Sequence, residues 1–248
     1  MINFNRRAFD AKQTAKWYQK GADEGNATAQ YNLGWAYASG EGVPKDDKQA
    51  AKWYQKAADQ GDAKAQLNLG AMYELGAGVL KDYKQAVKWY QKAADQGDVD
   101  AQGYASAQYN LGLMYDNGEG VLKDDKQAAK WYQKAADQGH TSAQSNLGLM
   151  YEDGRGVLKD YRQALKWHRK AADEGDAGAQ TSLAWMYSSG RGVPKDDKQA
   201  AKWYQKAADQ GYASAQYNLG QMYRKGEGVL KDDKQAAKWY QKAADQGD

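Results

Sequence analysis

The feature that most constrains the fold is a long internal repeat. A tryptophan preceded by lysine recurs at spacings of 36, 36, 42, 36, 36 and 36 residues. The segment KDDKQAAKWYQKAADQG occurs four times without a change. Such a period is typical of chains that stack copies of one supersecondary unit, so the fold is read from that unit. The tryptophans are Trp17, Trp53, Trp89, Trp131, Trp167, Trp203 and Trp239.

Each unit is predicted to begin with a helix that ends in Gly-x-Gly-Val. In the unit at 62–97, Leu69, Gly70 and Tyr73 share one face of this helix. The glycine after it can adopt the left-handed conformation that closes many helices. Asp82 and Gln85 then have the spacing of a capping box, which predicts the start of a second helix. The same Asp-x-x-Gln spacing recurs at Asp10, Asp46, Asp124, Asp160, Asp196 and Asp232.

The second helix of that unit carries Ala86, Trp89, Tyr90 and Ala93 as its apolar stripe. Burying one large side chain contributes about 1.5–3 kcal/mol. Ordering the backbone costs about 1–2 kcal/mol per residue. One unit is therefore too small to fold alone, and neighbouring units must stack. We predict an all-α protein, an αα-superhelix (solenoid) of six 36-residue helix pairs preceded by one extra N-terminal helix.

The unit AQYNLGWAYASGEGVPKDDKQAAKWYQKAADQG resembles the Sel1-like repeat (SLR) family, a relative of the tetratricopeptide repeat. The resemblance covers residues 10–248. The chain departs from the pattern at Ala184, which replaces the usual glycine, at His168, which replaces a tyrosine, and at Ala77, where the loop lacks a charge. The resemblance implies that the first helices line the concave side. It also implies use as an adaptor in protein complexes.

We expect one solenoid over residues 1–248, with its N-terminal helix at about 10–24, inside a segment 1–25. The third repeat contains a six-residue insertion, because 97–102 and 103–108 both resemble the opening of a first helix. A longer connector, a break at Gly103 and a local change of curvature are expected there. The repeats are predicted at 26–61, 62–97, 98–139, 140–175, 176–211 and 212–248.

No polar capping helix follows the last second-type helix of the sequence. Trp239 and its neighbours are therefore expected to be less covered than their counterparts in inner repeats. Either head-to-tail association between chains or excision from a longer array would account for this.

The composition excludes several classes of site. Cysteine is absent, which excludes disulfides, thiolate metal sites and a cysteine nucleophile. The 35 basic and 32 acidic residues give a net charge of +3, too small to indicate a nucleic-acid partner. No apolar run is long enough for membrane insertion, and residues 1–7 lack the apolar segment of a secretory signal. We expect a cytoplasmic protein, or a periplasmic or secreted one if a signal peptide was removed.

The two histidines do not indicate a reactive site. His168 occupies a position that is tyrosine in other repeats, so it is interpreted as a packed aromatic substitute. His140 opens a first helix and is expected to be solvated. Neither is paired with Asp or Glu at metal-binding spacing, so we predict no metal site and no cofactor.

Three further patterns have a structural explanation. Gly-x-Gly-Val recurs at every hairpin without the strand that a phosphate loop needs. Lys48, Lys52 and Lys56 form a row on the convex side, but Asp46 and Asp59 flank it, which favours a solvated face. Helical repeats that read RNA need a basic groove, which is not predicted here.

Positions of the first helix that packing does not fix are expected to diverge between repeats, and three of them do. They share one helical face at i, i+4 and i+7 or i+8. Together they would form a concave groove with aromatic anchors near both ends, an acidic middle and a basic C-terminal end. The predicted partner-binding residues are Tyr31, Trp35, Ser39, Leu67, Glu74, Tyr109, Leu113, Asp116, Leu149, Glu152, Asp153, Trp185, Ser188, Tyr217, Gln221, Arg224 and Lys225.

The leading functional interpretation is a non-enzymatic scaffold that binds a protein or peptide in this groove. One alternative is a hydrolase or β-lactam-binding protein, as the cysteine-rich members of the family suggest. The lack of cysteine and of any Ser-x-x-Lys motif is against it. The other alternative is a purely structural or consensus-designed repeat array that self-associates end to end.

Overall fold

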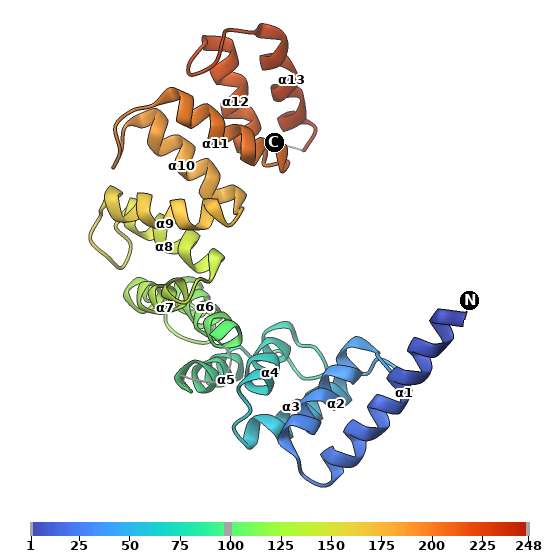
Figure 1. Cartoon of the computed structure of the whole chain (residues 1–248). Coiled ribbons are helices and arrows are strands. Elements are labelled where there is room, and N and C mark those ends of the chain that lie inside the picture. The colour runs from blue at the N-terminus through green and yellow to red at the C-terminus, as the bar shows by residue number, and fades with distance from the viewer. Residues whose placement is uncertain (1, 97–100, 247–248) are drawn as a thin grey trace. The chain divides into compact units, whose positions relative to one another are not determined.

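The computed structural model describes the backbone of residues 2–96 and 101–246, and the side chains of residues 10–96 and 104–246. The described residues form thirteen α-helices and no strand (Figure 1). The helices are α1 (Ile2–Asp23), α2 (Ala27–Ser39), α3 (Asp47–Asp59), α4 (Ala63–Leu75), α5 (Tyr83–Asp95), α6 (Ala101–Asn117), α7 (Asp125–Asp137), α8 (Thr141–Asp153), α9 (Tyr161–Asp173), α10 (Ala177–Ser189), α11 (Asp197–Asp209), α12 (Ala213–Lys225) and α13 (Asp233–Ala244).

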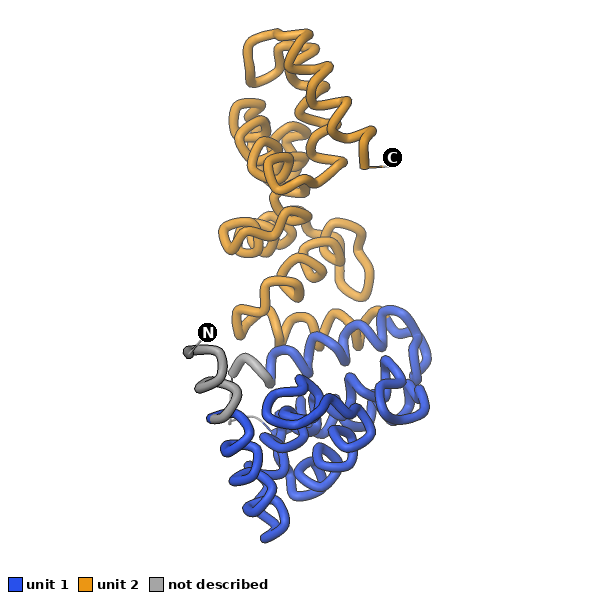
Figure 2. The backbone as a smooth tube through the Cα atoms, turned by 90° about the vertical axis from the view of Figure 1, so that its right-hand side faces the viewer, with its two compact units in different colours: residues 1–124 blue, residues 125–248 orange. Residues whose placement is uncertain are grey.

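The helices divide between two units, residues 1–124 with α1 to α6 and residues 125–248 with α7 to α13 (Figure 2). Within each unit a first helix packs on the second helix of its own pair, as α2 does on α3 and α10 on α11. Each second helix also packs on the next first helix, as α3 does on α4 and α11 on α12. The chain is thus the all-α repeat solenoid that the sequence predicts.

The predicted caps are present at the ends of the helices. Asp82 Oδ1 accepts hydrogen bonds from the backbone N–H groups of Lys84 and Gln85, at 2.9 and 3.1 Å. The reciprocal half of a capping box is replaced, because the Asp82 N–H donates to the carbonyl of Tyr73. Gly76 ends α4 in the left-handed conformation, at φ 73°. These caps fix the hairpin between the two helices of a pair.

The second glycine of Gly-x-Gly-Val has a different role from the first. A Cβ atom on Gly78 would lie 2.1 Å from the carbonyl oxygen of Asp47, at the start of the preceding second helix. Gly120 and Tyr83 have the same relation one repeat later, at 2.4 Å. Only glycine permits this approach, so the loop of one pair is in contact with the helix before it.

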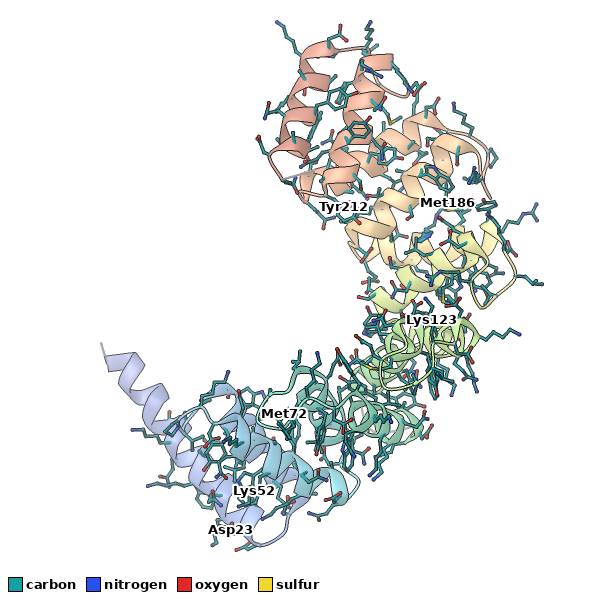
Figure 3. All side chains as sticks on the ribbon, turned by 180° about the vertical axis from the view of Figure 1, so that it is seen from behind. Asp23, Lys52, Met72, Lys123, Met186 and Tyr212 are labelled. Atoms are coloured by element: carbon teal, nitrogen blue, oxygen red, sulfur yellow. The ribbon has the colours of Figure 1, made fainter. Side chains whose placement is uncertain are left out.

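The core forms where each second helix meets the first helix of its own pair and the second helix of the preceding pair. Trp89 of α5 packs with Ala50, Ala51 and Tyr54 of α3 and with Leu69 of α4. The small residues let the helices approach closely, while the aromatic rings fill the space between pairs. Met72 of α4 is buried in the same cluster, and Met186 is buried at the equivalent position of α10 (Figure 3).

Buried glutamines join successive pairs through a polar chain. Gln66, at the start of α4, donates from Nε2 to the carbonyl of Ala58 at the end of α3, over 3.1 Å. Gln96 then donates to Gln66 Oε1 over 2.6 Å. Gln30 with Gln60, Gln180 with Gln210, and Gln216 with Gln246 repeat this contact.

The polar chain is incomplete at Gln144. Its Oε1 atom is buried and has no hydrogen-bond partner. The residue that should donate to it, thirty positions on, is Glu174 rather than glutamine. A carboxylate cannot donate a hydrogen bond, so this buried acceptor is unsatisfied.

Glu174→Gln should therefore stabilise the protein. The new amide can donate to Gln144 Oε1, and one such hydrogen bond contributes about 1 kcal/mol to the free energy of unfolding. Urea unfolding followed by circular dichroism would measure it. Gln210→Glu is the matched control: it removes the donor to Gln180 and should destabilise. Equal unfolding curves for Glu174→Gln and the parent would contradict the assignment.

His140 caps a helix rather than being simply solvated, which corrects the expectation from sequence. It lies at the N-cap of α8, where its Nδ1 atom accepts a hydrogen bond from the Ala143 N–H at 3.3 Å. The side chain is half-buried, and burial lowers its pKa below the usual 6.5. Only the neutral imidazole can accept this bond.

The free energy of unfolding should therefore fall as the pH is lowered, because protonation of His140 removes its capping hydrogen bond. The unfolded chain takes up a proton near pH 6.5, before the folded one does, so the loss begins there and continues through the lower folded pKa. His140→Asn introduces the residue that caps α2 at Asn26, and its amide does not titrate in this range. The acid-dependent decrease in the free energy of unfolding should therefore become smaller. A cap contributes about 0.5–2 kcal/mol, which sets the upper limit of the change. Urea unfolding at about pH 7.5 and about pH 5 would compare the two proteins. An unchanged difference between the two pH values would contradict this role.

Three other sequence predictions are wrong in detail. Helix α1 begins at Ile2 rather than near residue 10, so Asp10 lies inside a helix and caps nothing. Gly103 does not break α6, which is continuous and 17 residues long; the predicted longer connector falls on 97–100, outside the described residues. Trp239 is 5% exposed, as Trp53 is, because the preceding pair covers it. Its neighbours Ala237, Tyr240 and Ala244 are more exposed than the equivalent residues of inner repeats, as predicted.

Candidate binding surface

The residues predicted to bind a partner all lie on first helices, and the structure distributes them between the two units. Neighbouring first helices contact each other within a unit, as α4 does with α6 and α8 with α10. The members in residues 1–124 are Tyr31, Trp35, Ser39, Leu67, Glu74, Tyr109, Leu113 and Asp116. Those in residues 125–248 are Leu149, Glu152, Asp153, Trp185, Ser188, Tyr217, Gln221, Arg224 and Lys225.

The position two residues before the invariant leucine faces the second helix and the next pair. The ring of Tyr31 lies 5.8 Å from that of Tyr54, with a tilt of 38°. Ser145 Oγ donates to Asp176 Oδ1, at the cap of the next first helix, over 3.2 Å. Tyr217 has the same neighbour type, Tyr240 at 5.5 Å, but is 51% exposed. This position therefore contributes to packing, and it is most accessible at Tyr217.

The position two residues after the invariant leucine is more accessible. Trp35 is 44% exposed and Leu149 is 38% exposed. Trp185 is partly buried, and the guanidinium carbon of Arg191 lies 4.5 Å from its ring centroid. Trp35 and Trp185 thus occupy equivalent positions but are not equally available to a partner.

The position directly after the invariant tyrosine is tied to the second helix, contrary to the expectation that packing leaves it free. Glu74 Oε2 accepts a hydrogen bond from the Tyr90 hydroxyl at 2.6 Å. Burial, together with this bond, raises the pKa of Tyr90. Glu152 Oε1 lies 3.0 Å from Nε2 of the fully buried His168. Glu74 therefore has a hydrogen-bond partner inside the fold, whereas Glu152 lies close to His168 without a hydrogen bond between the two atoms.

The basic C-terminal end is partly compensated by neighbouring groups. Arg224 donates from a guanidinium nitrogen to Gln221 Oε1 over 3.2 Å. The Lys225 ammonium lies 3.8 Å from a carboxylate oxygen of Glu227. Both cations remain exposed. Of the two cations, Lys225 thus has a carboxylate beside it, and Arg224 is hydrogen-bonded to an uncharged amide.

The buried histidine and tyrosines are not accessible to a substrate. His168 is fully buried, and its ring packs against Gly148, where a Cβ atom would lie 2.5 Å from Cε1 of the imidazole. Burial raises the pKa of Tyr54 and of Tyr204 to about 12, so both are neutral phenols at physiological pH. Over the described part of the chain, no three His, Asp or Glu side chains cluster as a metal site would require.

The predicted lysine row is partly occupied by internal contacts. The Lys56 ammonium lies 4.1 Å from the ring centroid of Trp53, and Lys206 lies 4.0 Å from that of Trp203. The same arrangement recurs in the other second helices. Cation–π contacts of this kind give the lysines a role in the fold.

Two exposed features were not anticipated from the sequence. Leucines in the loop after Gly-x-Gly-Val are almost fully exposed, between 89% and 91%. Two other repeats have proline in place of this leucine, at positions 44 and 194. Because proline is disfavoured inside helices, it could have indicated that this position lies in a loop outside the helix pair. Trp17 of α1 is 67% exposed. The leucines are Leu80, Leu122, Leu158 and Leu230.

None of the described helices combines the length and apolarity that crossing a membrane requires.

Solved structures that resemble this chain are repeat proteins. One is c5321, described as a protective antigen present in uropathogenic Escherichia coli strains and displaying an SLR fold; it is 40% identical, with a TM-score of 0.87 over 94% of this chain. The match covers 49% of c5321, so the chain spans about half of that protein. A Sel1 repeat protein from Oxalobacter formigenes is 35% identical, with a TM-score of 0.77 over 95% of this chain and 94% of its own.

No functionally curated protein matches the sequence. The family model described as Sel1 repeat matches residues 6–26, 27–62, 63–98, 105–140, 141–176, 177–212 and 213–248. The first segment covers α1 from residue 6 onward, and each of the others covers one helix pair, except that 105–140 begins inside α6. The segments leave out 99–104, which overlaps the predicted insertion. The chain therefore belongs to the Sel1 repeat family.

Proposed function

We propose that this chain is a non-catalytic scaffold that binds a protein or peptide through the exposed surface of its first helices. The observation that carries the proposal is the exposure of large apolar side chains at one face of these helices. Trp35, Leu149 and Tyr217 are 44%, 38% and 51% exposed. Large exposed aromatic residues are common anchors at protein interfaces.

The two alternatives have less support. A hydrolase or β-lactam-binding protein needs an accessible nucleophile and base, but one histidine is fully buried and the other accepts a helix-capping hydrogen bond. A purely structural array with end-to-end association would depend on exposed aromatic groups such as Trp17 rather than on the first helices. In this proposal residues 1–248 act as one solenoid, with the repeat boundaries predicted from the sequence.

The test compares two triple variants in affinity capture, with bound proteins identified by mass spectrometry. The first, Trp35→Ala/Leu149→Ala/Tyr217→Ala, removes the exposed apolar groups of the first helices. It should lose a partner that the parent retains. Substitutions at exposed positions usually change stability by no more than about 0.5 kcal/mol each, so helicity should be preserved.

The second variant, Leu80→Ala/Leu122→Ala/Leu158→Ala, is the matched control. It removes a similar amount of exposed apolar surface from the loops instead. Retention of the partner by this variant, with loss by the first, supports the proposal. Loss by the loop variant alone would assign binding to the loop leucines and overturn the proposal. Equal capture by all three proteins would also contradict it.

A further inference from the structure

A small cavity of about 430 Å³ lies between α1 and α2. Its lining combines two aromatic rings with two carboxylates and a hydroxyl group: Tyr18, Trp35, Asp10, Glu41 and Thr14. Trp35 is one of the most exposed large apolar residues of the first helices. Among the side chains that the structure describes, none forms an ion pair with either carboxylate. The cavity thus presents negative charge beside an accessible indole ring.

The Asp10 carboxylate is available because of the unusual length of α1. In other repeats the equivalent aspartate caps a second helix; Asp160, for example, accepts from the backbone N–H groups of Arg162 and Gln163. Helix α1 instead continues to Ile2, so no exposed helix start lies beside Asp10. Its carboxylate makes no capping bond, and Asp10 lines the cavity.

The chain contains an internal precedent for what such a cavity holds. The equivalents of Trp35 and Glu41, 150 positions later, are Trp185 and Arg191. The guanidinium of Arg191 lies 4.5 Å from the ring centroid of Trp185 and 5.4 Å from that of Tyr161. It also donates to the Tyr161 hydroxyl over 3.1 Å. In residues 125–248 the loop itself therefore supplies a cation to the tryptophan.

At Trp35 the same loop position is Glu41, which has the opposite charge and no affinity for the ring face. We infer that the Trp35 cavity binds the guanidinium group of an arginine from a protein partner. A planar guanidinium can stack on the indole and donate to Asp10 and Glu41 at once. A lysine ammonium lacks the flat face and the fork of donors, so arginine fits this combination better.

This inference rests on the proposed binding role of the first helices and names the chemistry of one contact. It also explains why Trp35 and Trp185 differ in accessibility. One is covered from within the chain, and the other is left for a partner. The acidic surroundings of Trp35 imply that attraction at this site weakens as salt concentration rises.

The test uses the whole chain labelled with ¹⁵N, because the indole N–H signal reports on each tryptophan separately. N-acetyl-arginine amide is the probe, and the citrulline analogue, which has the same shape without the charge, is its control. The arginine probe should shift the Trp35 signal in a saturable manner, and citrulline should not. Trp35→Phe identifies the signal by its loss.

Two charge variants sharpen the test. Glu41→Arg places a guanidinium at the loop position of Arg191, although Ala11 stands where Tyr161 does. The chain's own guanidinium should then cover Trp35 and reduce the response to the probe. Arg191→Glu should expose Trp185 and give it a new response. Asp10→Asn, which keeps the size of the side chain, should weaken binding at Trp35. Circular dichroism and the unaffected indole signals would establish that each variant is folded.

Several results would overturn the inference. These are the absence of any shift at Trp35, equal shifts with citrulline, an undiminished response in Glu41→Arg, or a stronger response to trimethyl-lysine amide than to the arginine probe. The capture experiment with Trp35→Ala/Leu149→Ala/Tyr217→Ala is independent of this probe. A partner lost there without any arginine response would leave the scaffold function in place and remove only the arginine site.

Discussion

The structure depends on the contact between each second helix and the pair before it. Trp89 of α5 illustrates it: the ring packs with side chains of α3, from the preceding repeat, as well as with α4 of its own repeat. No single pair encloses such a ring, so the folding of each repeat requires its neighbour. The glutamine chain and the close contacts of the second loop glycine cross the same boundary between pairs. Stability is therefore a property of neighbouring repeats rather than of one repeat.

Most of the fold was predictable, because repeats of nearly the same sequence adopt the same structure and have the same kind of neighbour in an array. The period located both helices of every repeat, and the left-handed cap at Gly76 and the Asp82 cap have their predicted roles. The errors occur where the sequence departs from the period. Asp10 has the capping signature, but nothing in residues 1–9 marks the helix as continuing. Gly103 has low helix propensity, yet it lies inside the continuous helix α6.

The candidate surface was less predictable, since divergence between repeats has two physical causes. A position can vary because it faces solvent, as Trp35 and Leu149 do. It can also vary together with an internal partner. Glu152 lies beside His168, in the one repeat where histidine replaces the usual tyrosine. A single sequence shows both kinds of variation as the same pattern, and only the contacts separate a residue that faces a partner from one that satisfies a neighbour.

The two connections of each repeat differ in how closely the surrounding protein encloses them. At the hairpin within a pair, Gly78 lies against the backbone of the preceding helix, with no room for even a methyl group. At the connection between pairs, an atom added to Gly61 or Gly175 would meet nothing within 4 Å. Inserted residues should therefore be tolerated in the connections between pairs and not in the hairpins within a pair. The six-residue insertion follows this rule, and a foreign loop or tag inserted at Gly61 or Gly175 should leave the neighbouring pairs undisturbed.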